Sequence, residues 1–232
     1  MTTGASLPLD AFRLPLSRLA RTPRGWVPVV AWAVLAVAAA AVLHRSARTS
    51  ADALEVVFGQ LVLPLASFTI VGGVLGGDGL ARSTRALVAF GAAPARVALA
   101  TLLAGILASA LFGAVVGAGV AAFAHTSMDP PLVHDALTSA WIAALGGAAY
   151  AALFSMGASF GKRGVGRSII LVVDWILGAG DGALAVVTPR AHVRSLLGGD
   201  GVLGLSGPLS ALVLVTLTIA FSAIAVARTR RA

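Results

Sequence analysis

Cysteine is absent from the 232-residue chain, and charged residues make up only 11% of it. Without cysteine there is no disulfide framework, no thiolate metal site and no cysteine nucleophile. Soluble domains carry roughly 25% charged residues, so this composition excludes an ordinary soluble domain. Only three methionines are present, which, with cysteine missing, argues against a path for soft metal ions.

Apolar residues are what the chain has in quantity, at 58% with a mean hydropathy of +0.95. A membrane-spanning helix needs about 20 mostly apolar residues, so the chain can hold about six of them and no separate soluble catalytic domain. We therefore predict an all-α integral membrane protein that forms a single domain over residues 1–232. The six predicted spans are residues 26–43, 53–75, 96–123, 136–159, 168–187 and 209–227.

The formal charge of +8 is explained by membrane topology. The arginines stand in short groups between apolar runs and form no continuous polar face, so we expect no nucleic acid partner. Most of the 17 Lys and Arg residues fall in residues 1–25, 76–96, 161–167 and 228–231. Because cytoplasmic loops are enriched in Lys and Arg, both termini and the 76–96 loop are predicted to be cytoplasmic.

Two segments are predicted to lie at the membrane surface. In residues 1–25, Leu9, Phe12, Leu16 and Leu19 fall on one helical face and the arginines fall away from it. This pattern is typical of a cytoplasmic interfacial helix. Residues 188–208 read as broken, re-entrant helical pieces on the outer side, which backbone chemistry permits only where protein or water satisfies the polar groups.

Catalytic motifs are not supported. Residues 157–161 match the spacing of a nucleophile elbow around Ser159, but that chemistry needs a histidine base, and all four histidines are predicted on the opposite side. Lys162 lacks the other residues of a phosphate-binding loop. We therefore expect no enzyme activity in this chain alone, and no cofactor or metal bound directly to it.

Ionisable and strongly polar groups inside spans are costly, at about 2.5 to 3.5 kcal/mol for a charged group by insertion scales. Glu55, Gln60 and Asp174 are the candidates, either for a translocation path or for pairing between helices. Both interpretations of Asp174 stay open. Glycines four residues apart, such as Gly113 and Gly117, predict close helix packing, and we favour packing within the chain over a subunit interface.

A short polar break between the second and third spans carries Asp78, Arg82, Ser83, Thr84 and Arg85, and we predict a small cytoplasmic helix there. The chain then returns to the membrane through the sequence Gly-Ala-Ala-Pro-Ala-Arg at residues 91–96. With the basic interfacial segment and the broken segment after the fifth span, this layout resembles the permease subunits of type-2 ATP-binding-cassette exporters. Pro94 and Arg96 match the family's turn, whereas its usual acidic approach is reduced here to Asp78.

The resemblance implies a dimer of this chain with itself or with a related permease, in contact with lipid in a bacterial cytoplasmic (inner) membrane. It also implies a separate ATPase subunit that holds ATP and Mg and receives the 76–96 coupling loop. An amphiphilic, lipid-like or peptide-like cargo would be moved outward. Two alternatives remain: an ion- or proton-coupled carrier that uses Asp174, or a membrane anchor subunit that transports nothing.

Overall fold

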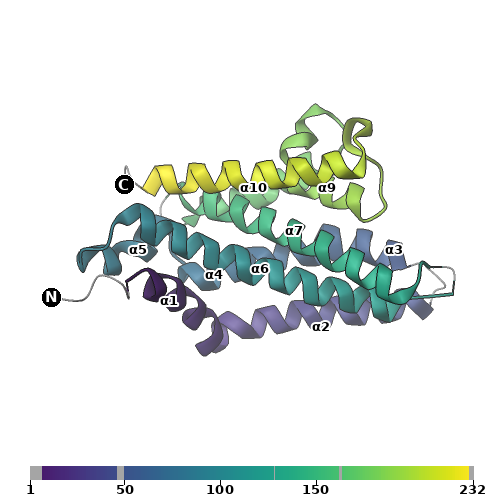
Figure 1. Ribbon diagram of the computed structural model, residues 1–232, viewed down its shortest axis with the longest axis horizontal. Helices are drawn as coiled ribbons and strands as arrows, with labels where there is room; N and C mark the ends of the chain where they lie inside the picture. The colour runs from purple at the N-terminus through teal and green to yellow at the C-terminus, as the bar shows by residue number, and fades with distance from the viewer. Residues whose placement is uncertain (1–6, 46–49, 128, 162–163, 230–232) are drawn as a thin grey trace.

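The computed structural model describes residues 7–45, 50–127, 129–161 and 164–229, with side chains in the first helix described from residue 11 onward. Within these residues the chain forms helices and no strands, so the all-α prediction is confirmed. The long helices lie side by side along the long axis of the molecule, as Figure 1 shows.

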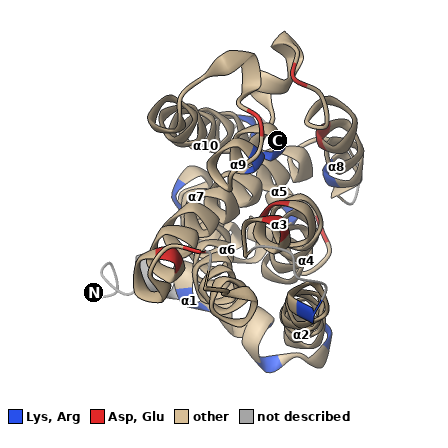
Figure 2. Ribbon diagram, turned by 90° about the vertical axis from the view of Figure 1, so that its right-hand side faces the viewer, with Lys and Arg blue, Asp and Glu red and all other residues tan. Residues whose placement is uncertain are grey.

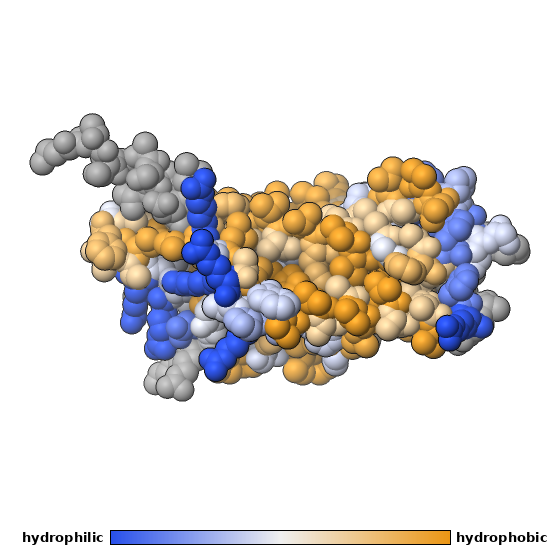
Figure 3. Space-filling model, turned by 90° about the horizontal axis from the view of Figure 1, so that it is seen from below, coloured by the Kyte–Doolittle hydropathy of each residue, from blue (hydrophilic) through white to orange (hydrophobic). Residues whose placement is uncertain are grey.

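Five stretches are long and apolar enough to cross a membrane, as expected of a multi-pass membrane protein. They correspond to the first, second, third, fourth and sixth predicted spans. Figure 3 shows the matching surface, with an apolar middle and hydrophilic residues toward both ends. The stretches are α2 (Pro23–Arg45), residues Ser50–Ala89, α6 (Pro94–Ala124), α7 (Leu132–Ala158) and α10 (Gly207–Thr229).

The predicted fifth span, residues 168–187, is not one spanning helix. Helix α8 (Gly166–Leu177) has 12 residues, which at 1.5 Å per residue reach about 18 Å against a hydrocarbon core of about 30 Å. The glycines at 178, 180 and 182 interrupt the helix, and short pieces follow. These pieces are the 3₁₀ turn η3 (Ala183–Val187), helix α9 (Pro189–Leu196) and the 3₁₀ turn η4 (Val202–Gly204).

Although α8 is short, it carries the chain back along the long axis of the molecule. It begins where α7 ends, and α10 later runs back, so α1 and the end of α10 lie at the same end of the molecule (Figure 1).

Helix α1 (Leu7–Arg21) is the helix expected within residues 1–25. Phe12, Leu16 and Leu19 are partly buried, whereas Arg18 and Arg21 are exposed, as the amphipathic pattern predicts. The side chain of Leu9 lies outside the described residues.

The second span changes its winding partway. It consists of α3 (Ser50–Asp52), a π-helix η1 (Ala53–Val62) and α4 (Leu63–Leu75). Leu63 donates its backbone N–H to the carbonyl of Phe58, five residues back. Pro64 follows at once and has no N–H, so it cannot extend this pattern to the carbonyl of Gly59, and α4 begins here.

Helices α6 and α7 form the closest pair in the bundle. A Cβ built on Gly113 would lie 2.3 Å from the carbonyl oxygen of Ala143, and one built on Gly147 would lie 2.4 Å from that of Ser109. Real Cβ atoms do not approach so closely, so only glycine allows these backbones to touch. The predicted packing of Gly113 and Gly117 within the chain is confirmed.

Candidate functional site

The polar break predicted to form a cytoplasmic helix is the helix α5 (Leu80–Ala89). Gly76 ends α4 with a left-handed backbone, φ 68°, which glycine adopts without strain. Leu80 and Thr84 are buried against the bundle, whereas Arg82 and Arg85 are exposed. Phe90, directly after the helix, is 83% exposed. The outward surface of α5 therefore combines two cations with an exposed aromatic ring.

The other predicted residues of this loop interact within α5 and its first turn. Asp78 pairs with Arg82 at 3.2 Å, one helical turn along. Because both side chains are well exposed, such a pair contributes little to stability, about 0 to 1 kcal/mol. The hydroxyls of Ser83 and Thr84 donate to the carbonyl oxygens of Leu80 and Ala81 within the same turn.

Helix α5 also touches the connection between α7 and α8. A Cβ on Gly79 would lie 2.9 Å from the carbonyl oxygen of Ala158, and one on Gly164 would lie 3.1 Å from the carbonyl oxygen of Asp78. Backbone therefore meets backbone at the start of α5. Through this contact α5 is linked to α7 and α8 as well as to α4 and α6, its neighbours in the chain.

Asp174 on α8 is 2% exposed and lies deep in the bundle. Its neighbours are the Tyr150 hydroxyl from α7 and Arg190 from α9, which interact with it electrostatically. In the described part of the chain no group meets hydrogen-bond geometry to either carboxylate oxygen. Asp174 also lines a cavity of about 190 Å³ between α7, α8 and α10, whose other lining residues are apolar except for Thr188.

Gln60 and Asp174 share Arg190 as a neighbour. Nη2 of Arg190 donates a hydrogen bond of 3.4 Å to Oε1 of Gln60, and its guanidinium lies 5.5 Å from the centre of the Trp175 ring. Arg190 thus connects η1 with α8 through the interior of the bundle.

Glu55 on η1 lies near Arg194, which stands one turn beyond Arg190 on α9. Its Oε1 would be 2.6 Å from a Cβ built on Gly199, so the loop after α9 closes over it. Arg194 forms an ion pair with Asp181 and donates a 3.0 Å hydrogen bond to the carbonyl oxygen of Ala179. Glu55, Gln60 and Asp174 are therefore brought together around α9, through two arginines four residues apart.

Sequence reasoning missed Arg190, Arg194 and Tyr150 as parts of this cluster. It assigned both arginines to the outer side only as topology signals. Tyr150 is the chain's single tyrosine and lies within a predicted span, which is a signal that a phenol hydroxyl needs a partner there. Arg167 likewise looks like a loop charge in the sequence, although its Nε and Nη1 are buried.

Among the residues that the structure describes, no group of three or more His, Asp or Glu side chains could hold a metal ion. Comparisons with protein-family models, with curated proteins and with solved structures found no match to this chain.

Proposed function

We propose that this chain is the membrane-spanning subunit of an ATP-binding-cassette exporter in a bacterial cytoplasmic membrane. Its α5 would dock on a separate ATPase subunit that holds ATP and Mg. The observation that carries the proposal is the exposed surface of α5, formed by Arg82, Arg85 and Phe90. Arginine and aromatic residues are the side chains most often found at the energetic centres of protein interfaces.

The geometry around α5 suits transmission of movement. Tight turns join α5 to α4 at Gly76 and to α6 before Pro94, so a shift of α5 moves both spans. The contact of Gly79 with Ala158 and Gly164 extends this shift to α8. Closure of the ATPase subunits would then reach Asp174 through packed backbone, without a flexible linker.

Helices α2, α8 and α10 leave apolar side chains uncovered, with Val34 at 61%, Ile176 at 70% and Ile219 at 65% exposure. These faces suit lipid and a second permease, either another copy or a related chain. In such a dimer an amphiphilic, lipid-like or peptide-like cargo would move outward along largely apolar helices.

The direct test is purification of the tagged chain from its native membranes in mild detergent, with identification of every co-purifying protein. We expect a soluble subunit with a phosphate-binding loop. The double variant Arg82→Glu, Arg85→Glu should lose that subunit and keep the monodisperse elution of the wild type. A matched double variant, Arg13→Glu, Arg21→Glu, makes the same charge change on α1 and should keep it. Equal recovery with the α5 variant would refute the assignment.

A proton-coupled carrier is the second candidate, because Asp174 is buried beside a cavity without a hydrogen bond from the described residues. Intramembrane carboxyls of this kind serve as proton relays in carriers. In proteoliposomes that contain this chain alone, a carrier would move cargo under an imposed pH gradient, and Asp174→Asn would abolish that movement. An exporter permease would show no gradient-driven transport without its ATPase.

A further inference from the structure

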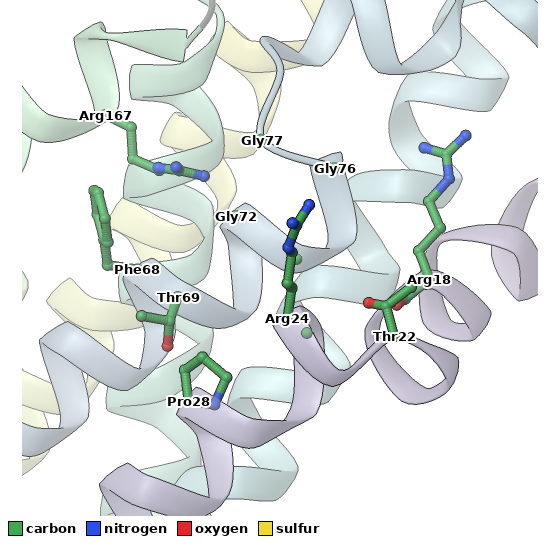
Figure 4. Close-up of a pocket in the computed structure, with 12 residues that line it drawn as sticks. Arg18, Thr22, Arg24, Pro28, Phe68, Thr69, Gly72, Gly76, Gly77 and Arg167 are labelled. Atoms are coloured by element: carbon green, nitrogen blue, oxygen red, sulfur yellow. The ribbon is translucent and has the colours of Figure 1, made fainter.

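A second and larger cavity, of about 500 Å³, lies at the end of the bundle that carries α1 and α5. It is enclosed by the corner between α1 and α2, by one face of α4 and by the first turn of α8. Figure 4 shows Arg18, Arg24 and Arg167 around it, with Thr22 and Thr69 also on its wall. Among the described residues no acidic side chain lines this cavity, so the charged groups known to line it are all cationic.

Arg167 is the most constrained of the three cations. Its guanidinium stacks on the Phe68 ring, 4.4 Å from the ring centre, and lies against Gly72, where a Cβ would be 2.9 Å from Nη1. Its Nε and Nη1 are buried, and neither has a hydrogen-bond partner in the part of the chain that the structure describes. Leaving buried donors of a charged group unpaired is costly, so the arrangement is suited to an anionic acceptor.

The other two arginines face the same space from the opposite wall. In Figure 4 the guanidinium of Arg24 points across the cavity toward Gly76, on the side opposite Arg167. The Nη1 of Arg18 lies 3.9 Å from the position of a Cβ on Gly76. Arg18 and Arg24 are exposed, so the cavity is open to solvent on their side.

Apolar residues precede Phe68, which lines the cavity, along the second span. Seen from the end of the molecule, α4 lies between α2 and α8 (Figure 2). Leu65 and Leu61 precede Phe68 by one and two helical turns on α4 and η1, and Leu61 remains 38% exposed. The cationic cavity therefore adjoins a helix that carries apolar side chains and is long enough to span a membrane.

We propose that this cavity binds the phosphate headgroup of a phospholipid from the cytoplasmic leaflet. The guanidinium of Arg167 donates to the phosphate oxygens, and Arg18 and Arg24 close the site from the other wall. The acyl chains lie along the stripe of Leu65 and Leu61. A planar guanidinium pairs with phosphate through two parallel hydrogen bonds, which a hydrated ammonium does not reproduce. The proposal concerns lipid binding by the chain alone, so it can fail while the exporter assignment stands. Equally, the exporter assignment can fail while the lipid proposal stands.

The test is native mass spectrometry of the purified full chain in mild detergent, titrated with phosphatidylglycerol. Diacylglycerol with the same acyl chains, which lacks the phosphate, and inorganic phosphate are the comparison ligands. We expect one tightly retained phosphatidylglycerol per chain and no retained diacylglycerol. Arg167→Gln should weaken phosphatidylglycerol binding at least tenfold, and Arg167→Lys should restore only part of it.

Two further variants separate cavity binding from general attraction to a basic protein. Thr22→Phe fills the rim of the cavity from an exposed position and keeps every charge, so it should weaken binding at least tenfold without disturbing the fold. Arg21→Gln removes an exposed arginine of α1 that does not line the cavity, and this variant should bind as the wild type does. Wild-type binding by Thr22→Phe, or equal losses for Arg21→Gln and Arg167→Gln, would overturn the proposal. Displacement of the lipid by millimolar inorganic phosphate would reassign the site to a soluble anion.

Discussion

Replacing Gly113 with alanine tests the closest helix contact in the bundle. The added Cβ would lie 2.3 Å from the carbonyl oxygen of Ala143. An unstrained carbon–oxygen contact needs roughly 1 Å more, so α6 and α7 must separate along their whole interface. Overpacking of this kind costs about 1 to 3 kcal/mol. Alanine within a helix is otherwise more stable than glycine by about 0.5 to 1 kcal/mol. The variant is therefore destabilised only by the part of the clash cost that exceeds this gain.

The matched control is Gly119→Ala on the same helix, where a new Cβ would meet nothing within 4 Å. It carries the same gain in helix propensity without the clash, so the two variants should differ by the cost of the clash, about 1 to 3 kcal/mol. For a chain of this size that corresponds to an apparent melting temperature about 2 to 12 °C lower for Gly113→Ala than for the control. Thermal unfolding followed by size-exclusion chromatography in one detergent measures the difference. If the two variants melt together, the close approach of α6 and α7 is wrong.

Two smaller predictions concern loops. Arg194→Ala removes the contacts with Asp181 and Ala179, so amide hydrogen exchange in residues 178–182 should rise at least tenfold while exchange in α6 is unchanged; unchanged loop exchange would contradict the contacts. Burial alone would raise the pKa of Asp129, but hydrogen bonds from the N–H and hydroxyl of Thr126 outweigh it and lower this pKa. The stabilisation is therefore present at pH 7 and is lost as the pH falls through the lowered pKa. Asp129→Asn should accordingly melt below the wild type at pH 7 and together with it near pH 2. A difference in melting temperature that does not narrow toward low pH would contradict the lowered pKa of Asp129.

Most of the fold could be predicted because hydropathy reports how long an apolar stretch is. The spans near residues 26–43, 96–123 and 209–227 match α2, α6 and α10 within a few residues. Hydropathy does not show where a helix ends, however. Residues 168–187 are apolar on average, yet Gly178 ends α8 after 12 residues, so the fifth predicted span is not one spanning helix.

The candidate site likewise has a part that could be predicted from the sequence and a part that could not. Helix α5 could be predicted because its polar residues interrupt two apolar runs locally. The cluster around α9 could not, because Arg190 meets Gln60 across 130 residues of sequence. Arg190 and Arg194 also resemble ordinary topology charges when read in order along the chain. Only the folded arrangement shows that they turn inward, toward Glu55 and Asp174.

The placement of α1 and the last turn of α10 at one end of the bundle has a practical consequence (Figure 1). A linker from the C-terminal end of one copy to the N-terminal end of another would stay on a single side of the membrane. Two copies could therefore be expressed as one tandem polypeptide without altering the direction in which any helix is inserted. Such a fusion would allow Asp174 to be replaced in one half only, which would separate the contribution of each copy to the proposed transport.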